Sequence, residues 1–338
     1  MAASQSNNQI ADNVLGLIGN TPMVRLSRYL DQEDVNLIAK IEALNPGGSA
    51  KDRPARHMIE CALADGRLKA GDTVVESSSG NIGIGLAQVC AIYKLRFICV
   101  VDPNAQTQNV AIIRALGGQI ELVSHAPDGD FLTARLDRVA ALLDADPRLF
   151  WPNQYTNLDN PASHELGTIA EIDAALDGEI DVLFVACSST GTARGCRDYL
   201  RRMGRATKII SVDAMGSVLF NGTAGSRKIS GMGAGRIPEL AIGQEFDDLV
   251  RVSDITCVAG CRRAVAREGL LVGGSGGGVL EAVRSMQGEL AGQTVVAIIH
   301  DSGSRYLGTV FDPDWVEREL GVCESDLLVL AGLANAVS

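Results

Sequence analysis

The amino-acid sequence predicts an α/β protein with two parallel or mixed sheets, each forming a three-layer unit with helices on both faces. Short β-branched runs alternate with segments of helical periodicity along the chain, which favours parallel sheets. Several of these runs are apolar throughout, as is typical of strands covered on both faces. The chain has 338 residues, too many for one minimal domain, and 46% of them are hydrophobic, enough to supply full cores.

The alternating segments predict strands and helices in a regular order. The expected strands are 37–43, 73–76, 97–101, 119–123, 182–186, 208–213 and 295–300. The expected helices are 52–64, 81–93, 107–116, 131–143, 163–175, 192–203, 254–268 and 277–286. The helix at 52–64 has clear start signals, because Asp is a favoured N-cap residue and Pro54 fits the first turn.

Two sheets account for this alternation better than one. A first group of four strand–helix units spans residues 48–150, and a second series begins near Val182. The stretch 152–160, rich in Asn and Pro, is the expected crossover, and the run at 37–43 could join either sheet. Residues 321–338 are expected to form a C-terminal tail.

The net charge, the absence of targeting patterns and the spacing of the cysteines limit the partners, location and metal content expected of this protein. The formal net charge is −11, so we expect no nucleic-acid partner, and an anionic ligand must be held by local donors such as backbone N–H groups. The sequence has neither a signal-peptide pattern nor an apolar window of membrane-spanning length, so we expect a cytoplasmic protein without a membrane partner. None of the eight cysteines forms a C-x-x-C pair, which predicts reduced, mostly buried thiols and no metal ion.

A glycine loop at 45–54 carries the first candidate for chemistry. The chain has no G-x-G-x-x-G motif and no Walker A loop, which argues against a dehydrogenase or a kinase. Loop 45–54 instead places Lys51 at a helix start, where the helix dipole disfavours a cation and lowers the pKa of the amine. A nucleophilic or Schiff-base lysine requires such an amine. On position alone, a surface lysine at a turn is the better interpretation.

Three further loops offer groups that bind anions. Loop 76–83 has hydroxyls, an amide and helix N–H groups that suit a carboxylate, although ordinary capping by serine explains it more simply. Loop 187–192 has the chemistry of a phosphate site or of a capped turn. Loop 273–278 is so rich in Gly that close approach to a ligand is favoured, with Ser275 as its hydrogen-bonding side chain. An amine, a carboxylate site, a phosphate site and a lone hydroxyl together suit a pyridoxal phosphate enzyme acting on amino acids.

Four motifs in the same order resemble the cysteine synthase/cystathionine β-synthase family of fold-type II pyridoxal phosphate enzymes. They are Gly19-Asn20-Thr21-Pro22-Met23-Val24-Arg25-Leu26 and the loops 45–54, 78–83 and 273–277. The resemblance covers about residues 13–315. It implies the tryptophan synthase β-like fold, with the active site between two domains. Residues 45–150 would form a smaller, mobile α/β domain, and residues 12–44 together with 151–320 would form a larger one that anchors the cofactor. It also implies a homodimer.

The resemblance implies a role for each matching residue. Lys51 matches the Schiff-base lysine and general base, and Asn81 matches the asparagine that hydrogen-bonds the phenolic oxygen of the cofactor. Ser275 matches the serine facing the pyridine nitrogen, and a neutral hydroxyl there favours β-elimination over transamination. The cofactor's phosphate loop matches Ser188, Ser189, Thr190, Gly191 and Thr192. The loop for the substrate α-carboxylate matches Ser78, Ser79, Gly80 and Asn81.

Two departures from the cysteine synthase pattern resemble the diaminopropionate branch of the family. Ile82 stands where cysteine synthases usually have Thr, and the phosphate loop reads Ser-Ser-Thr-Gly-Thr instead of Gly-Thr-Gly-Gly-Thr. In that branch, substrate-site positions correspond to Arg135, Tyr155 and Ser188. A solvated helix arginine, a packed crossover tyrosine and a capping serine explain these residues equally well.

The implied reaction is a β-replacement. O-phospho-L-serine and L-glutamate would give N-(2-amino-2-carboxyethyl)-L-glutamate and phosphate through an aminoacrylate intermediate, in 2,3-diaminopropionate biosynthesis for a siderophore or peptide natural product. The alternative is a cysteine synthase that uses O-acetylserine or O-phosphoserine with sulfide. A cystathionine β-synthase is disfavoured because the chain has no N-terminal haem-binding stretch, and the intact Lys51 argues against a regulator that keeps only the fold.

Overall fold

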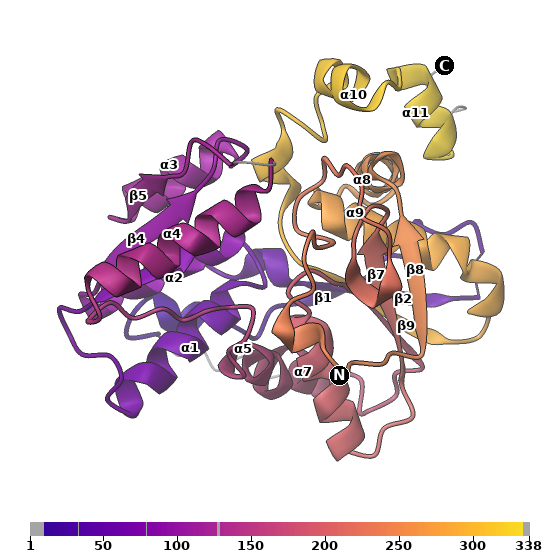
Figure 1. The fold of residues 1–338 in the computed structure, drawn as a ribbon. Coiled ribbons are helices and arrows are strands. Elements are labelled where there is room, and N and C mark those ends of the chain that lie inside the picture. Colours follow the sequence, from indigo (N-terminus) through magenta and orange to yellow (C-terminus); the bar gives the residue numbers. More distant parts are fainter. Residues whose placement is uncertain (1–9, 33, 79, 127–128, 334–338) are drawn as a thin grey trace.

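The chain folds into two sheets that lie side by side, each with its own helices (Figure 1). The computed structural model describes residues 10–32, 34–78, 80–126 and 129–333. One sheet has six strands in the order β1-β2-β9-β6-β7-β8, and the other has three in the order β3-β4-β5. All neighbouring strands are parallel except β1 and β2. The strands are β1 (Met23–Arg25), β2 (Asn36–Ile41), β3 (Thr73–Ser77), β4 (Arg96–Val101), β5 (Gln119–Leu122), β6 (Val182–Ala186), β7 (Lys208–Ala214), β8 (Asp248–Val252) and β9 (Thr294–Ile299).

The predicted fold class is confirmed, and the structure adds two strands. The run at 37–43, which could have joined either sheet, is β2 and pairs with β9 in the larger sheet. Strands β1 and β8, which the sequence analysis missed, form the two edges of that sheet. Because neither edge strand is buried along its whole length, neither contains the apolar run by which the central strands were found.

Helices cover both faces of each sheet. They are α1 (Asp52–Ala64), α2 (Asn81–Tyr93), α3 (Thr107–Ala115), α4 (Phe131–Ala145), α5 (Asp159–Ser163), α6 (Ile169–Ala175), α7 (Gly191–Arg202), α8 (Asp254–Glu268), α9 (Gly274–Ser285), α10 (Pro313–Leu320) and α11 (Glu324–Leu330). Short 3-10 turns lie at Val14–Leu17, Glu42–Leu44, Leu219–Asn221, Glu239–Ala241, Gln287–Glu289 and Gly303–Tyr306. The single helix expected at 163–175 is instead α5, a π-helical turn at His164–Thr168, and α6.

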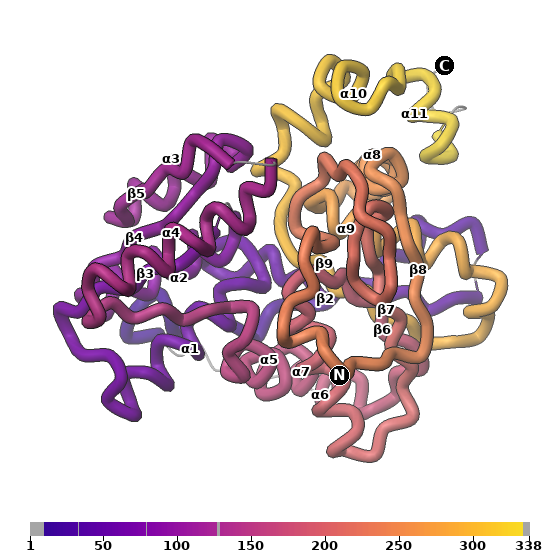
Figure 2. The backbone as a smooth tube through the Cα atoms, in the orientation of Figure 1, coloured from indigo at the N-terminus to yellow at the C-terminus, as the bar shows by residue number. Residues whose placement is uncertain are grey.

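Alternating strand residues divide the larger unit into two core layers. Leu37 and Ala39 of β2 point toward α8 and α9, whereas Ile38 packs with α6 and α7. The smaller sheet is divided in the same way, with α1, α2 and α3 on one face and α4 on the other. Figure 2 shows the backbone of the smaller and the larger unit, and the segment before α5 by which the chain passes from one to the other. Each sheet therefore has hydrophobic clusters of its own.

Glycines of loop 273–278 also serve helix packing, and their expected close approach to a ligand stays a prediction. Helix α9 begins at Gly274, three residues earlier than predicted, so most of these glycines are helical. A Cβ on Gly277 would overlap the backbone carbonyl of Cys257 on α8, and a Cβ on Gly260 of α8 would overlap that of Gly277. Glycine is therefore required where α8 and α9 touch backbone to backbone.

The C-terminal segment docks on the larger unit in its described part. Leu327 of α11 is fully buried in the same core cluster as α8. Among the residues that the structure describes, no helix has both the length and the apolar character needed to cross a membrane.

A buried ion cluster ties α1 to the larger sheet. Arg53 donates to both oxygens of Glu42, just after β2, at 2.7 and 2.8 Å. It also donates to both oxygens of Glu171 on α6, at 2.6 and 2.7 Å. Lys40 of β2 and Thr21 complete the cluster, because Lys40 binds Glu171 and Thr21 donates to Glu42. The motif at residues 19–26, through Thr21, and the loop at 45–54, through Arg53, thus belong to the same buried cluster.

Replacing Arg53 with methionine is expected to lower the free energy of unfolding by about 3–5 kcal/mol, because Glu42 would keep a fully buried carboxylate without its charged partner. Urea denaturation followed by circular dichroism measures the shift in midpoint. Arg148→Met is the control, since its ion pair with Asp146 lies on the surface, and its midpoint should stay at the wild-type value. Equal midpoints for the two variants would contradict this reading of the cluster.

Candidate active site

Lys51 lies where α1 begins, beside the carboxyl ends of two strands of the larger sheet. It is the N-cap residue of α1, and its backbone N–H donates to Ser49 Oγ at 3.2 Å. The N–H of Ala50, one residue earlier, donates to the carbonyl of His300 at the end of β9 at 2.7 Å. Gly85 of α2 allows this close packing, because a Cβ there would come within 3.2 Å of the Lys51 carbonyl. Lys51 thus lies where parallel strands commonly present ligands.

Burial lowers the pKa of the Lys51 amine, while the negative charges of Asp301 and Glu42 oppose that shift. The direction agrees with the sequence expectation, and its main cause here is loss of solvent. The Lys51 amine donates no hydrogen bond to the part of the chain that the structure describes. An unpaired amine of lowered pKa is suited to attack a carbonyl carbon or to accept a proton.

The sequence analysis missed two charged residues next to Asn81. Asn81, the first residue of α2, donates from Nδ2 to Asp301 Oδ2 at 2.8 Å, and Arg305 donates to its Oδ1. Asp301 also accepts from Tyr306 at 2.6 Å, and Arg305 donates to the Gly47 carbonyl. These bonds orient the Asn81 amide. The signal for Asp301 was its place directly after the apolar run of β9.

Three buried polar atoms beside Lys51 have no hydrogen-bond partner among the described residues. They are both ring nitrogens of His300 and Oδ1 of Asp301. Burial and the Lys51 charge lower the pKa of His300 to about 3, so the ring is neutral at physiological pH. Unpaired polar atoms inside a protein are costly, and a bound polar group that pairs with them removes that cost.

The loop at 188–192 joins β6 to α7 and has the form of an anion site. Thr190, the N-cap residue of α7, has a left-handed backbone with φ of +66°, which is uncommon for a residue other than Gly. Gly191 cannot carry a side chain, because its Cβ would overlap the amide of Asn160. The backbone N–H groups at the start of this twelve-residue helix therefore face a crowded, largely buried end, where a phosphate is favoured.

Hydroxyls of this loop already have partners in the protein. Ser188 Oγ donates to the Gly233 carbonyl at 3.0 Å, Thr190 Oγ1 accepts from Gln244 at 3.0 Å, and Thr192 Oγ1 lies 3.2 Å from His164 Nε2. The neighbouring Ser189 is also buried. Backbone N–H groups are consequently the main donors that the loop offers to a phosphate.

The candidate carboxylate loop is held by one of its own serines. Ser78 Oγ accepts from the N–H groups of Gly80 and Gly83, both at 3.1 Å, which is the capping interaction that the sequence also allowed. Gly80 is the N-cap residue of α2. Ser79, another predicted carboxylate ligand, lies outside the described residues. The structure thus assigns the Ser78 hydroxyl to shaping the loop.

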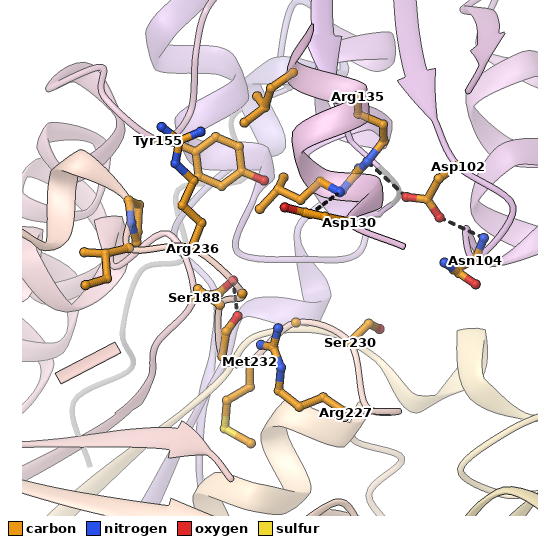
Figure 3. Close-up of a pocket in the computed structure, with 18 of the residues that line it drawn as sticks. Asp102, Asn104, Asp130, Arg135, Tyr155, Ser188, Arg227, Ser230, Met232 and Arg236 are labelled. Carbon is orange, nitrogen blue, oxygen red and sulfur yellow. Dashed lines mark hydrogen bonds and ion pairs between the residues drawn. The ribbon is translucent and has the colours of Figure 1, made fainter. Parts of the chain in front are cut away.

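Arg135, Tyr155 and Ser188 line one cavity of about 1200 Å³ between the two sheets (Figure 3). Arg135, on α4, pairs with Asp102 at 3.0 Å, which is seen in the figure as a dashed contact. Burial raises the pKa of Tyr155 to about 12, so its hydroxyl remains a hydrogen-bond donor. The structure therefore brings these three predicted residues together from separate elements.

Lys51, Asn81 and Ser275 are not among the residues that line this cavity, whereas Gly231 and Gly233 are. Ser275, buried near the start of α9, has its hydroxyl 3.5 Å from where a Cβ on Gly231 would stand. The Gly231–Gly233 segment thus separates the Ser275 side of the site from the cavity that contains Arg135 and Tyr155.

This donor set fits a phosphate-bearing aldehyde such as pyridoxal phosphate. The unpaired Lys51 amine suits the aldehyde, and the N-terminus of α7 suits the phosphate. The unpaired atoms of His300 and Asp301 leave polar groups for further contacts between these two points.

Comparison with known proteins gives matches over almost the whole chain. An N-(2-amino-2-carboxyethyl)-L-glutamate synthase of Ralstonia nicotianae is 42% identical over 311 residues, covering 91% of this chain and 92% of that protein. A synthase of the same name from Cupriavidus metallidurans is 39% identical over 314 residues, covering 91% and 92%. Among solved structures, a cysteine synthase from Entamoeba histolytica matches with a TM-score of 0.86 and 29% identity, covering 99% of this chain and 98% of that one.

Residues 14–301 also match the family described as pyridoxal-phosphate dependent enzyme, a range that includes Lys51 and every other predicted site residue. The matched range ends at Asp301, which pairs with Asn81. With this match, the identities above and a donor set that fits the cofactor, the chain belongs to the pyridoxal phosphate-dependent enzymes of the cysteine synthase type.

Proposed function

We propose that this protein joins O-phospho-L-serine and L-glutamate to form N-(2-amino-2-carboxyethyl)-L-glutamate, with release of phosphate. The product would enter 2,3-diaminopropionate biosynthesis for a siderophore or peptide natural product. The names of the relatives from Ralstonia nicotianae and Cupriavidus metallidurans support this reaction. The observation that carries it is an arginine in the cavity whose charge has no partner.

Arg227 is that arginine. Its guanidinium lies against Gly233, where a Cβ would stand 2.5 Å from Nη1, and Gly235, where a Cβ would stand 3.5 Å from Nη2. It forms no ion pair with the described residues, and its Nε has no hydrogen-bond partner among them. Burial lowers its pKa, although Asp213 and Asp254 oppose the shift. Because a guanidinium keeps its proton in proteins, the cavity presents a partly desolvated cation.

An uncompensated cation favours an anionic second substrate. L-glutamate brings two carboxylates and a nucleophilic amine, and a cavity of about 1200 Å³ has room for it beside a bound amino acid. Sulfide, the second substrate of a cysteine synthase, needs neither the volume nor the carboxylate partner. In Figure 3, Arg227 and Ser188 lie near each other in the cavity, with Tyr155 and Arg135 farther away.

Each residue of the candidate site would have a separate role in this reaction. Pyridoxal phosphate, when bound, supplies the electron sink that lets a Cα–H bond break and a group leave Cβ. The Lys51 amine would take the Cα proton and later return it. Asn81, held by Asp301 and Arg305, would orient the cofactor ring, and the start of α7 would hold its phosphate. The neutral Ser275 hydroxyl would leave the ring nitrogen unprotonated.

We also propose that residues 45–150 move over residues 12–44 and 151–320 by rotating about the point where Arg53 attaches α1 to the larger unit. We propose as well that the protein is a cytoplasmic homodimer. The separate hydrophobic clusters of the two sheets support independent movement. Closure would bring Arg135 of α4 toward Ser188 and exclude water from the reacting atoms.

A product competition tests the proposed function. Purified holoenzyme receives O-phospho-L-serine with equal concentrations of glutamate and sulfide, and the products are identified by mass spectrometry. The glutamate adduct is expected as the main product, because the cavity has room and an unpaired cation for a carboxylate, which glutamate carries and sulfide lacks. Cysteine as the main product would instead establish a cysteine synthase. Repeating the assay with O-acetyl-L-serine identifies the preferred leaving group.

Replacing Lys51 with alanine is expected to reduce kcat by roughly 10²–10⁴-fold, because the chain loses its acid–base group at Cα. Steady-state formation of the glutamate adduct measures the loss. Lys69→Ala, a lysine on an exposed turn, is the matched control and should keep wild-type kcat. A Lys51→Ala variant that is folded and fully active would rule out the assigned role.

Replacing Arg227 with glutamine is expected to raise the KM for glutamate about 10–100-fold, which is the loss of one charge-assisted carboxylate contact. If Arg227 selects glutamate, the KM for O-phospho-L-serine should change by less than about twofold, because Arg236, which also lines the cavity, keeps its charge in this variant. Lys228→Gln is the control, because Lys228 already pairs with Glu319 at 2.8 Å. Parallel increases in both KM values would show that Arg227 does not select glutamate.

A further inference from the structure

A second cluster of reactive side chains lies on α1, away from the cavity. His57 and Cys61 are one helical turn apart on this helix, and Asp159 is the first residue of α5, which packs against it. One ligand atom from each of the three residues lies within 4.8 Å of the other two. The proposed reaction uses none of them.

The spacing within this cluster fits a tetrahedral metal ion. His57 Nε2 and Cys61 Sγ lie 3.7 Å apart. Zinc bonds of about 2.3 Å to sulfur and about 2.0–2.1 Å to nitrogen, at the tetrahedral angle, place those two atoms about 3.6 Å apart. The side chains are therefore close to a binding arrangement before any ion enters.

The ligand chemistry selects the kind of ion. A thiolate, an imidazole and a carboxylate are typical zinc ligands, whereas Mg²⁺ and Ca²⁺ prefer oxygen alone. All three residues are half-buried, so an ion can enter from solvent and a water molecule can complete the coordination. Without metal, the Cys61 thiol contacts both His57 and Asp159, so the same three side chains already converge on one point.

The nearest cation competes only weakly for Asp159. Arg67 lies 3.7 Å from Asp159 but pairs more closely with Asp65, at 2.7 Å. Asp159 can therefore turn toward a metal ion while Arg67 keeps a carboxylate partner. Because Arg67 also pairs with Asp65, Asp159 is not the main partner of that arginine.

We propose that His57, Cys61 and Asp159 form a binding site for one Zn²⁺-class ion per chain. The ion would join α1, whose first turn carries Lys51, to α5, which follows the crossover into the larger unit. Because two ligands come from α1 and one from α5, bound metal holds these helices together. Such a link stabilises the folded protein by binding only its native arrangement.

Cobalt(II) titration of the chelator-treated holoenzyme tests this site, since tetrahedral Co²⁺ bound to thiolate absorbs in the visible range and can be displaced by Zn²⁺. We expect one Co²⁺ per chain. The single variants His57→Gln, Cys61→Ser and Asp159→Asn should each weaken binding by at least about tenfold. Cys323→Ser and His125→Gln, at another half-buried cysteine and an exposed histidine, are controls and should bind as wild type does.

Thermal unfolding gives a second readout that is independent of colour. Zn²⁺ should raise the Tm of the wild-type protein and of both controls, and should leave the Tm of the three ligand variants unchanged. Unchanged metal-free Tm values establish that those variants are folded. The proposal is overturned if the wild-type holoenzyme binds no Co²⁺, or if the ligand variants bind it as tightly as the controls do.

Discussion

Arg53 donates four hydrogen bonds to Glu42 and Glu171 from the protein interior, two residues after Lys51. Its bonds to Glu171, together with that of Lys40, hold the pKa of this carboxyl at about 2, although burial alone would raise it. Removing such charges from water is costly, and bidentate geometry on both sides compensates. The helix that carries Lys51 is thereby fixed to β2 and α6, and much of the candidate site depends on that attachment.

The surroundings of the lysine follow from this placement. With α1 fixed at the carboxyl end of the larger sheet, Lys51 lies near Asp301 and Cys187, which follow β9 and β6. Burial there lowers the pKa of the Lys51 amine and keeps the His300 ring neutral. The same burial leaves His300 and Asp301 with unpaired polar atoms.

Local sequence patterns predicted most of what lies within single loops. Lys51 at a helix start and the turn into α7 could be identified because strand, glycine and helix follow one another directly. Partnerships between distant residues could not be predicted. Asn81 and Asp301 are 220 residues apart, and the position of Arg227 against Gly233 exists only after folding. The edge strands β1 and β8 were missed because exposure on one side removes the apolar signal.

Charge pairing explains how a protein of net charge −11 can admit anions. Total charge acts at long range and is screened by salt, whereas binding inside a cavity depends on the groups that line it. Arg135 is largely neutralised by Asp102, but Arg227 has no ion-pair partner in the described part of the chain. Arg135 and Arg227 have the same formal charge but thus differ in the positive potential that they present to a ligand in the cavity. The paired arginine shapes the cavity wall. In the function proposed above, the unpaired one attracts an anion, so that substrate selection would depend on where the protein omits a carboxylate as much as on where it places a cation.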